Sequence, residues 1–326
     1  MPLIVRFRPF RPWMPVPPEI PASGYKGKAG LKWLTSREVE KFAASGTDAF
    51  RLADSPGLWV ERFGSAVLIS MSTETDPLPL VAGMHARAHR PEAVFCRRLV
   101  HAPGKSDTPW PVLPAGSPPS TRFLCRESGL AYEVDFSLGY SCGFFPDQRA
   151  NRSRLSSLAA KRVLNCFAFT CSFSVSAAFA GASTTSIDLS KSVLARGRQN
   201  FEVNNLPLAG HRFYPDDVFE CLPRLARRGE RFDAIILDPP TFSRGRGGKV
   251  FRAENQLGEL VGLALACAEP GAEILLSTNC SGLDSKALRQ IAALRCPGAH
   301  SFHEEPALPD IPAERAARTL WFRCPG

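Results

Sequence analysis

Five short apolar runs in the second half of the chain each end near a polar residue that can bind a ligand or react with one. These residues are Thr170, Asp188, Asp217, Asp238 and Cys280. The carboxyl ends of neighbouring parallel strands meet at one edge of a sheet, so residues at such ends form a single ligand site. Asp188 lies about 20 residues after the first turn, where a carboxylate can accept hydrogen bonds from both hydroxyls of a ribose. The pattern predicts a nucleoside site beside a reacting centre.

Two of these aspartates have a purely structural alternative. Asp188 and Asp217 could each cap the following helix, because a short carboxylate accepts hydrogen bonds from the first helical turn. Asp238 differs, since two prolines follow it and fix a rigid, non-helical exit for its carboxylate. We therefore expect Asp238 to be functional. The turn at residues 170–174 lacks the G-x-G-x-x-G pattern, which argues against a dinucleotide ligand.

These residues need a framework of alternating strands and helices, and that pattern begins near residue 155. The predicted strands cover residues 163–167, 184–187, 211–214, 234–237, 273–277, 299–302 and 320–322. The clearest helices between them cover residues 253–268 and 285–294, the second with Asp284 as its N-cap. Such alternation favours an α/β fold with a mostly parallel, doubly wound sheet.

The first 150 residues follow a different pattern. Residues 1–34 predict an extended, proline-rich tail, and residues 35–44 a short helix capped by Thr35 or Ser36. The remaining predictions are strands at 58–60 and 66–69, a loop or linker at 109–119, and a β-hairpin at 123–136 that turns at Glu127-Ser128-Gly129. This part of the chain predicts a smaller α+β unit ahead of the α/β sheet.

Composition limits the class of protein. The 40 Lys and Arg residues against 31 Asp and Glu residues give a net charge of +9, which suits a polyanionic partner but also occurs in basic proteins that bind none. The ten cysteines form no C-x-x-C pair and have no histidine at zinc-site spacing, so we expect no metal and no disulfide framework. Buried thiols of this kind indicate the cytoplasm. The uncharged stretch at residues 163–187 carries too many Ser, Thr and Asn residues for a membrane span, so we expect no membrane association.

Several segments resemble the successive motifs of class I S-adenosylmethionine-dependent methyltransferases. They are VLNCFAFTCSFSVSAAFAGA, IDLSK, NFEVNN, DDVFECL, FDAIILDPPTFSR and LLSTNCSGL. They are most similar to the bacterial large-subunit 23S ribosomal RNA methyltransferases that form 5-methylcytosine. The segment GFFPDQR resembles that family's G-F-F-L-D-Q-R signature, and AFRLADSPGLWVERFG resembles a segment near its N-terminus. The similarity extends over residues 35–324.

The resemblance implies a Rossmann-like methyltransferase sheet with a smaller N-terminal α+β domain. The implied parts are a tail at 1–34, a substrate-recognition domain at 35–118, a β-hairpin connector at 119–150 and a methyltransferase domain at 151–326. It implies S-adenosylmethionine as cofactor, bound by Phe167, Thr170, Phe173, Ser174, Asp188, Asp217, Val218 and Asp238. It implies RNA as partner, contacted by Arg149, Phe242, Arg244, Arg246 and Lys249.

The implied chemistry is addition of the Cys280 thiolate to carbon 6 of cytosine, which activates carbon 5 toward the methyl group, while Asp238 holds the base. The alternative for Cys280 is a buried structural cysteine, for Phe242 a core aromatic, and for the loop cations solvated charge. Two whole-protein alternatives also stand: methylation of a guanine or amino nitrogen that needs no cysteine, and a non-catalytic RNA-binding protein. The oligomeric state, monomer or homodimer, is left open.

Three departures from the family pattern affect these expectations. Ser172 stands where the family has glycine, and its side chain could crowd the cofactor. Pro146 replaces the leucine before D-Q-R. The residues ahead of position 35 leave no room for the family's N-terminal PUA domain, so we expect it to be absent.

Overall fold

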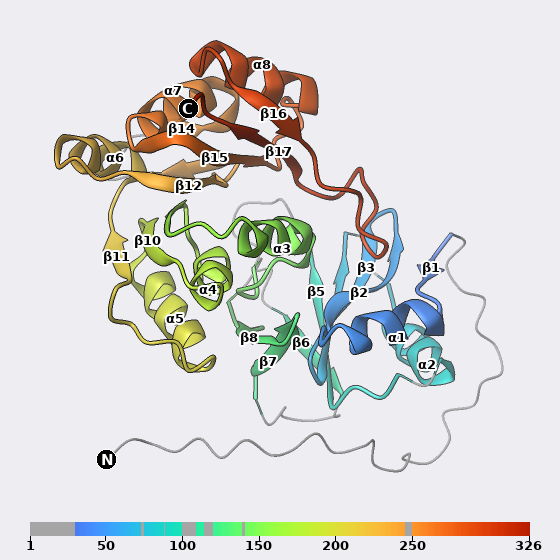
Figure 1. Cartoon of the computed structure of the whole chain (residues 1–326). Coiled ribbons are helices and arrows are strands. Elements are labelled where there is room, and N and C mark those ends of the chain that lie inside the picture. The colour runs from blue at the N-terminus through green and yellow to red at the C-terminus, as the bar shows by residue number, and fades with distance from the viewer. Residues whose placement is uncertain are drawn as a thin grey trace, which may run out of the picture.

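The computed structural model describes residues 30–72, 75–87, 89–99, 109–113, 120–138, 141–244 and 250–326. Two sheets dominate the described residues, one in each half of the chain (Figure 1). Most of the predicted tail, and the predicted RNA contacts Arg246 and Lys249, lie outside the described residues.

The N-terminal half is a six-stranded mixed sheet with two helices. Its strands, in spatial order, are β1 (Lys32–Trp33), β2 (Ala49–Ser55), β3 (Leu58–Phe63), β4 (Ala66–Met71), β5 (Ala93–Arg98) and β6 (Trp110–Leu113). Helix α1 (Ser36–Ala44) begins with the predicted cap, since Thr35 and Glu38 form a reciprocal capping box. Helix α2 (Leu78–Ala86) joins β4 to β5, the one parallel pair of this sheet. Strand β6 falls within the predicted 109–119 loop, so that prediction is wrong for residues 110–113.

The predicted hairpin lies between the two halves. Strands β7 (Arg122–Glu127) and β8 (Leu130–Asp135) pair antiparallel, and Ser128 and Gly129 both take positive φ in the turn, as a tight two-residue loop requires. Phe136 packs against Phe63 and Phe95 of the first sheet. The other side of the hairpin contacts the second half of the chain, so it joins the two parts through one core.

The second half contains all seven predicted strands. They are β9 (Arg162–Cys166), β10 (Ser183–Asp188), β11 (Arg212–Pro215), β12 (Phe232–Leu237), β15 (Ala268–Thr278), β16 (His300–His303) and β17 (Arg318–Arg323). Their spatial order is β11-β10-β9-β12-β15-β17-β16, with β17 antiparallel to both of its neighbours and the other pairs parallel. The predicted α/β Rossmann-like fold is therefore confirmed.

Helices cover both faces of this sheet, because its central strands are buried on both sides. Helices α6 (Val218–Arg227), α7 (Ala253–Leu265) and α8 (Ser285–Arg295) pack on one face. Helices α3 (Arg149–Ser157) and α4 (Ser172–Phe179) pack on the other, and α5 (Lys191–Glu202) packs beside the hairpin. Asp284 caps α8 as predicted. The strand order reverses between β9 and β12, and ligands of such sheets bind outside the strand ends at that point.

Candidate active site

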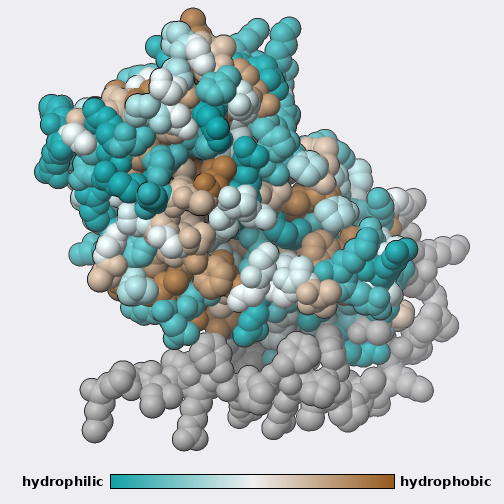
Figure 2. All heavy atoms as spheres, viewed as in Figure 1, coloured by the Kyte–Doolittle hydropathy of each residue, from teal (hydrophilic) through white to brown (hydrophobic). Residues whose placement is uncertain are grey.

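A cavity of about 1140 Å³ opens at this reversal point. Six of its lining residues were predicted as site residues: Phe167, Phe173, Asp188, Asp217, Val218 and Asp238. Residues of β3 and β5 of the first sheet also line it, so both halves of the chain form its walls. Figure 2 shows apolar residues near the centre of the face viewed in Figure 1, with hydrophilic residues around them.

The turn after β9 has an unusual backbone. Phe167, Phe169 and Cys171 all have positive φ, between +47° and +61°, a region that residues with a side chain rarely adopt. Gly197 of α5 makes room for Cys171, since a Cβ at position 197 would lie 2.5 Å from its Sγ atom. Strained conformations of this kind concentrate at ligand sites. Here the turn directs the Phe169 N–H toward the end of β10.

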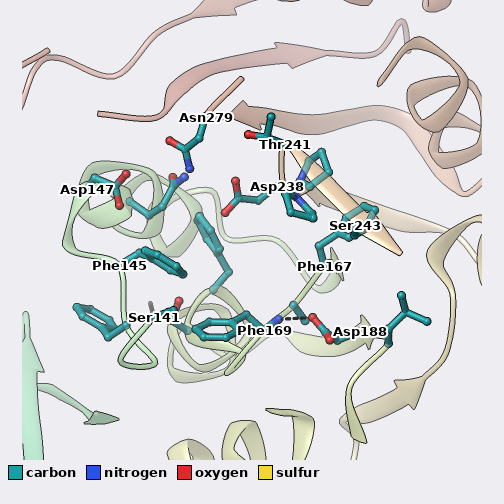
Figure 3. Close-up of a pocket in the computed structure, with 18 of the residues that line it drawn as sticks. Ser141, Phe145, Asp147, Phe167, Phe169, Asp188, Asp238, Thr241, Ser243 and Asn279 are labelled. Atoms are coloured by element: carbon teal, nitrogen blue, oxygen red, sulfur yellow. Dashed lines mark hydrogen bonds between the residues drawn. The ribbon is translucent and has the colours of Figure 1, made fainter. Parts of the chain in front are cut away.

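Asp188 ends β10 and receives that N–H. Its Oδ2 accepts a hydrogen bond from Phe169 N at 2.9 Å (Figure 3), and its Oδ1 accepts one from Ser190 N at 2.9 Å. Burial raises the pKa of Asp188, and the two backbone hydrogen bonds oppose that rise. Each carboxylate oxygen keeps a lone pair that a ribose hydroxyl can use. Ser190, not Asp188, caps α5, so the capping alternative is wrong for Asp188.

Asp217 both caps a helix and lines the cavity. Its carboxylate accepts a hydrogen bond from Phe219 N at 2.9 Å at the start of α6, so the capping alternative is correct for this residue. Phe251 lies beside it, with ring centroids 5.7 Å from Phe167 and 5.6 Å from Phe219. Val218, Phe219 and Phe251 also line the cavity. An apolar, partly aromatic wall next to a carboxylate suits an adenine ring and its amino group.

Two predicted cofactor contacts are placed differently. Thr170 is buried and donates from Oγ1 to the Gly143 carbonyl at 2.5 Å. Ser174 is also buried and hydrogen-bonds Asn165 and Ser186. Neither side chain lines the cavity, so the structure does not place Thr170 or Ser174 as a direct cofactor contact. Both instead support the turn from beneath.

Ser172 does line the cavity, beside an arginine that the sequence analysis missed. Arg152 of α3 is 2% exposed and forms a two-point ion pair with Glu127, through Nε–Oε1 at 2.6 Å and Nη2–Oε2 at 2.7 Å. Its Nη1 lies 3.4 Å from Ser172 Oγ, at the first residue of α4. An arginine beside a helix N-terminus suits a carboxylate, such as the one in the methionine part of S-adenosylmethionine. Ser172 therefore adds a hydroxyl at this end of the cavity.

Asp238 follows β12 and lies in the other part of the cavity. Burial raises its pKa to about 6, and the negative charge of Asp147 acts in the same direction. A hydrogen bond from Ser277 and the positive charge of Arg152 oppose the rise. Figure 3 shows Asp147 and Asn279 near Asp238 in this part of the cavity. Asp147 belongs to the segment GFFPDQR, and the sequence alone predicted no role for it.

Cys280 lies next to the cavity but is not among its lining residues. It follows β15, is 2% exposed, and its Sγ–H donates to Glu254 Oε1 at 3.4 Å. The preceding residue, Asn279, does line the cavity. The thiol thus points toward the start of α7 and is one residue away from the site.

Arg149, predicted near the cofactor or RNA, lies elsewhere. Its guanidinium donates to Asp310 at 3.0 and 3.2 Å and to the Ala49 carbonyl at 2.8 Å, and it stacks over Phe42. Asp310 also accepts from Arg51 N at 3.0 Å. Arg149 therefore joins the first sheet to the C-terminal segment, and the structure does not place it as an RNA contact.

The remaining predicted RNA contacts, Phe242 and Arg244, belong to a short hairpin that was not predicted from the sequence. Strands β13 (Phe242–Arg244) and β14 (Val250–Arg252) pair antiparallel beside the cavity. Phe242 is 44% exposed, with the Arg252 guanidinium 5.3 Å from its ring centroid, so the core-aromatic alternative is wrong. Within the described ranges, no cluster of His, Cys, Asp or Glu could hold a metal, and no helix is long and apolar enough to cross a membrane.

Residues 104–323 match a family described as S-adenosylmethionine-dependent methyltransferase. The chain belongs to this family. It is 33% identical over 272 residues to a protein of Escherichia coli named ribosomal RNA large subunit methyltransferase I, covering 79% of this chain and 65% of that one. An Aeromonas salmonicida protein of the same name is 37% identical over 177 residues, covering 54% and 44%. This family member thus spans 44% to 65% of the length of these relatives.

A solved structure supports the cofactor. The methyltransferase SMU.776, complexed with S-adenosylhomocysteine, is 25% identical, with a TM-score of 0.75 over 88% of this chain and 78% of that one. The residues of the present site fit that kind of ligand: an acid for the ribose, an aromatic wall for adenine and an arginine for the carboxylate. S-Adenosylmethionine is the cofactor of this enzyme.

Proposed function

We propose that this methyltransferase acts on RNA, at carbon 5 of a cytosine in large-subunit ribosomal RNA. The observation that carries the proposal is a single cavity that joins the cofactor residues Asp188 and Asp217 to the base-binding candidates Asp238 and Asn279. Its volume of about 1140 Å³ exceeds the range of about 300–1,000 Å³ usual for one ligand, which leaves room for a flipped-out base. The names of the relatives and the net charge of +9 support an rRNA substrate.

S-Adenosylmethionine supplies an electrophilic methyl group on a positively charged sulfur. Carbon 5 of cytosine attacks such a group poorly until a nucleophile adds to carbon 6. In the proposed reaction the Cys280 thiolate forms the S–C6 bond, the electron pair of the C5–C6 double bond shifts to form a C4–C5 double bond, and Asp238 protonates the ring nitrogen. Carbon 5 then takes the methyl group and loses its proton to water. The S–C6 bond breaks as the C5–C6 double bond forms again, which releases Cys280, and the ring nitrogen returns its proton to Asp238.

Two contacts bear on the role of Cys280. The Cys280 thiol already donates to Glu254, so that carboxylate can take its proton as the thiolate forms. The thiol must also turn from Glu254 toward the cavity, where its neighbour Asn279 already lies.

The ten cysteines are all free and buried, which supports a cytoplasmic place of action.

The same placement favours a second candidate, methylation of an amino nitrogen of the base. Asp238 and Asn279 can hold an amino group in the cavity, and no cysteine thiol is needed for that chemistry. Cys280→Ala distinguishes the two, with Cys267→Ala as a matched control in the same core. Labelled methyl transfer to rRNA should be lost only in Cys280→Ala if carbon 5 is the acceptor. Near-normal transfer by Cys280→Ala, with no adduct on 5-fluorocytosine RNA, would favour the nitrogen.

A further inference from the structure

One wall of the cavity carries three arginines that the proposed reaction does not use. Arg51 of β2, Arg97 of β5 and Arg315, from the segment between β16 and β17, all line the cavity. Trp59 of β3 lines it beside them, and the guanidinium carbons of Arg51 and Arg315 are each 5.4 Å from its ring centroid. We call these four residues the arginine wall. Both halves of the chain contribute to it.

Two of these arginines continue a sheet face that is apolar up to that point. Strand side chains alternate between the two faces of a sheet, so Arg51 and Arg97 share a face with Ala49 and Phe95, two positions earlier. Ala49 and Phe95 pack into the core that contains the hairpin, whereas Arg51 and Arg97 are 8% and 6% exposed and line the cavity. A face that only packed would continue with apolar side chains, because burying a guanidinium is unfavourable. The change from apolar to cationic at the cavity therefore indicates an anionic ligand.

Two carboxylates hold the arginines in place without matching their charge. Asp54 Oδ2 accepts a hydrogen bond from Arg51 Nη1 at 2.8 Å and lies 3.3 Å from Arg315 Nη1. Glu61 accepts one from Arg51 Nη2 at 3.1 Å and lies 4.0 Å from Arg97 Nη2. Three guanidinium groups thus share two carboxylates, which leaves one positive charge in excess. Arg51 Nε is buried and has no hydrogen-bond partner among the described residues, so a ligand oxygen could satisfy it.

The arginine wall borders the part of the cavity that we propose for the base. Ala317 N, two residues after Arg315, donates to Asp147 Oδ2 at 3.3 Å, and Asp147 lies in that part of the cavity (Figure 3). Arg318 Nη1, one residue further, donates to the carbonyl oxygen of Cys280 at 3.3 Å. Two or three residues of chain therefore separate Arg315 from contacts with the base site.

A base that flips into a cavity brings its sugar and the adjoining phosphates to the wall beside it. Guanidinium groups bind phosphate oxygens through paired N–H donors, and such contacts fix the position of a nucleic-acid strand. We propose that the arginine wall is an RNA subsite that binds the phosphate next to the flipped nucleotide, with Arg51 and Arg315 as donors and Trp59 holding both guanidinium groups by stacking. The inference rests on the proposed function in taking RNA as the substrate, but it does not depend on which base is methylated.

The first test compares the salt dependence of RNA binding in two variants of the full chain. Arg315→Gln removes a charge from the wall, and Arg154→Gln is the matched control. Arg154 also lies 5.4 Å from a tryptophan ring centroid, also forms ion pairs, and has a side chain 24% exposed against 21% for Arg315, but it does not line the cavity. With polycytidylate as the RNA and S-adenosylhomocysteine present, the slope of log K against log salt concentration should fall by about 0.7 in Arg315→Gln and stay unchanged in the control. An unchanged slope in Arg315→Gln would overturn the inference.

Arg315→Lys separates a phosphate contact from a purely structural role. Lysine keeps the positive charge but loses the planar stacking on Trp59 and the hydrogen bond from Nη2 to the Ser55 carbonyl. Because the release of counterions depends on charge, Arg315→Lys should restore the wild-type slope. The affinity for S-adenosylhomocysteine should be the same in all of these variants. A slope that stays reduced in Arg315→Lys would show that Arg315 only joins the two halves of the chain, and would overturn the inference.

A second test uses the unmodified protein, so it does not depend on the folding of any variant. Phenylglyoxal reacts with accessible guanidinium groups, and mass spectrometry of the peptides locates the modified arginines. Polycytidylate should protect Arg315 and leave Arg154 reactive. Equal modification of Arg315 with and without RNA would overturn the inference.

Polyadenylate in place of polycytidylate separates this inference from the proposed acceptor base. Protection of Arg315 and a reduced slope in Arg315→Gln with polyadenylate would support the phosphate subsite even where methylation of cytosine is disproved. Methylation of cytosine by Arg315→Gln with an unchanged slope on both RNAs would overturn the subsite and leave the proposed function intact.

Discussion

Replacing Asp238 by Asn should stabilise the fold, because the negative charge of Asp238 is unfavourable in its buried position. The same change should slow the reaction, because Asn has no carboxyl proton to give to the base. Burial raises the pKa of Asp238 from its ordinary 3.8 to about 6. At 1.36 kcal/mol for each pKa unit, this rise corresponds to about 3 kcal/mol of folding free energy. Asn has nearly the shape of a protonated Asp side chain and carries no charge at any pH.

The size of this stabilisation depends on pH. Below pH 3.8 the carboxyl group is protonated in both the folded and the unfolded chain, so it contributes no penalty. As the pH rises toward 6, the unfolded chain ionises Asp238 more readily than the folded chain, and wild-type stability falls. The advantage of Asp238→Asn should therefore be near zero at pH 4, grow up to pH 6, and stay at about 3 kcal/mol above that pH.

Urea unfolding at pH 4 to 8 measures this difference. Asp284→Asn is the matched control, because Asp284 is an exposed N-cap of α8 and Asn caps a helix equally well. Methyl transfer should fall strongly in Asp238→Asn and remain unchanged in the control. A stability difference that does not vary with pH, or a loss of stability above pH 6, would refute the argument from burial.

Three further predictions concern ligands. Asp188→Ala should weaken S-adenosylmethionine binding by about 1.5–3 kcal/mol in calorimetry, the usual size of a hydrogen bond to a charged group, and unchanged affinity would contradict the ribose assignment. Neutralising Arg244, Arg246 and Lys249 together should weaken RNA binding and leave cofactor affinity unchanged. The slope of log K against log salt concentration should fall by about 0.7–0.9 for each phosphate contact that is lost. An unaltered slope would show that these three cations are solvated and do not contact RNA phosphates. At pH 6, S-adenosylmethionine should release more protons on binding than S-adenosylhomocysteine, because only the former brings a positive sulfonium toward Asp238. Calorimetry in buffers of different protonation enthalpy measures this release, and equal release by both ligands would place the sulfonium away from Asp238.

The sequence predicts the catalytic sheet well because each strand there is a short apolar run with a polar residue at its end. That pattern located Asp188 and Asp238, and the structure places both in the cavity. It could not separate residues that face the cavity from those beneath the turn. Thr170 lies between two residues of positive φ, Phe169 and Cys171, and no local residue preference signals such a backbone. Ser174 lies on the buried face of α4, where it hydrogen-bonds Asn165 and Ser186.

The residues that the sequence analysis missed lie upstream of the sheet. Asp147, Gln148 and Arg152 belong to a short segment without strong periodicity, and their position depends on packing against β15, β17 and the hairpin. The segment's resemblance to a family signature drew attention to Arg149. The structure instead brings its neighbours to the cavity and directs Arg149 to Asp310. These contacts join residues 25 to 161 positions apart, across different elements, so spacing along the chain carries no information about them.

Asp238 therefore depends on more of the chain than its own motif. Ser277 of β15 and Arg152 of α3 lower its pKa, and Asp147, from the segment ahead of the sheet, raises it. The same α3 holds Arg152 at the cofactor end of the cavity and Arg149 against the first sheet. A shift of α3 would thus change cofactor binding, the proton on Asp238 and the contact between the two halves together. This shared dependence explains why α3 buries polar side chains, Asn151 and Arg152, at positions where an ordinary helix would bury apolar ones.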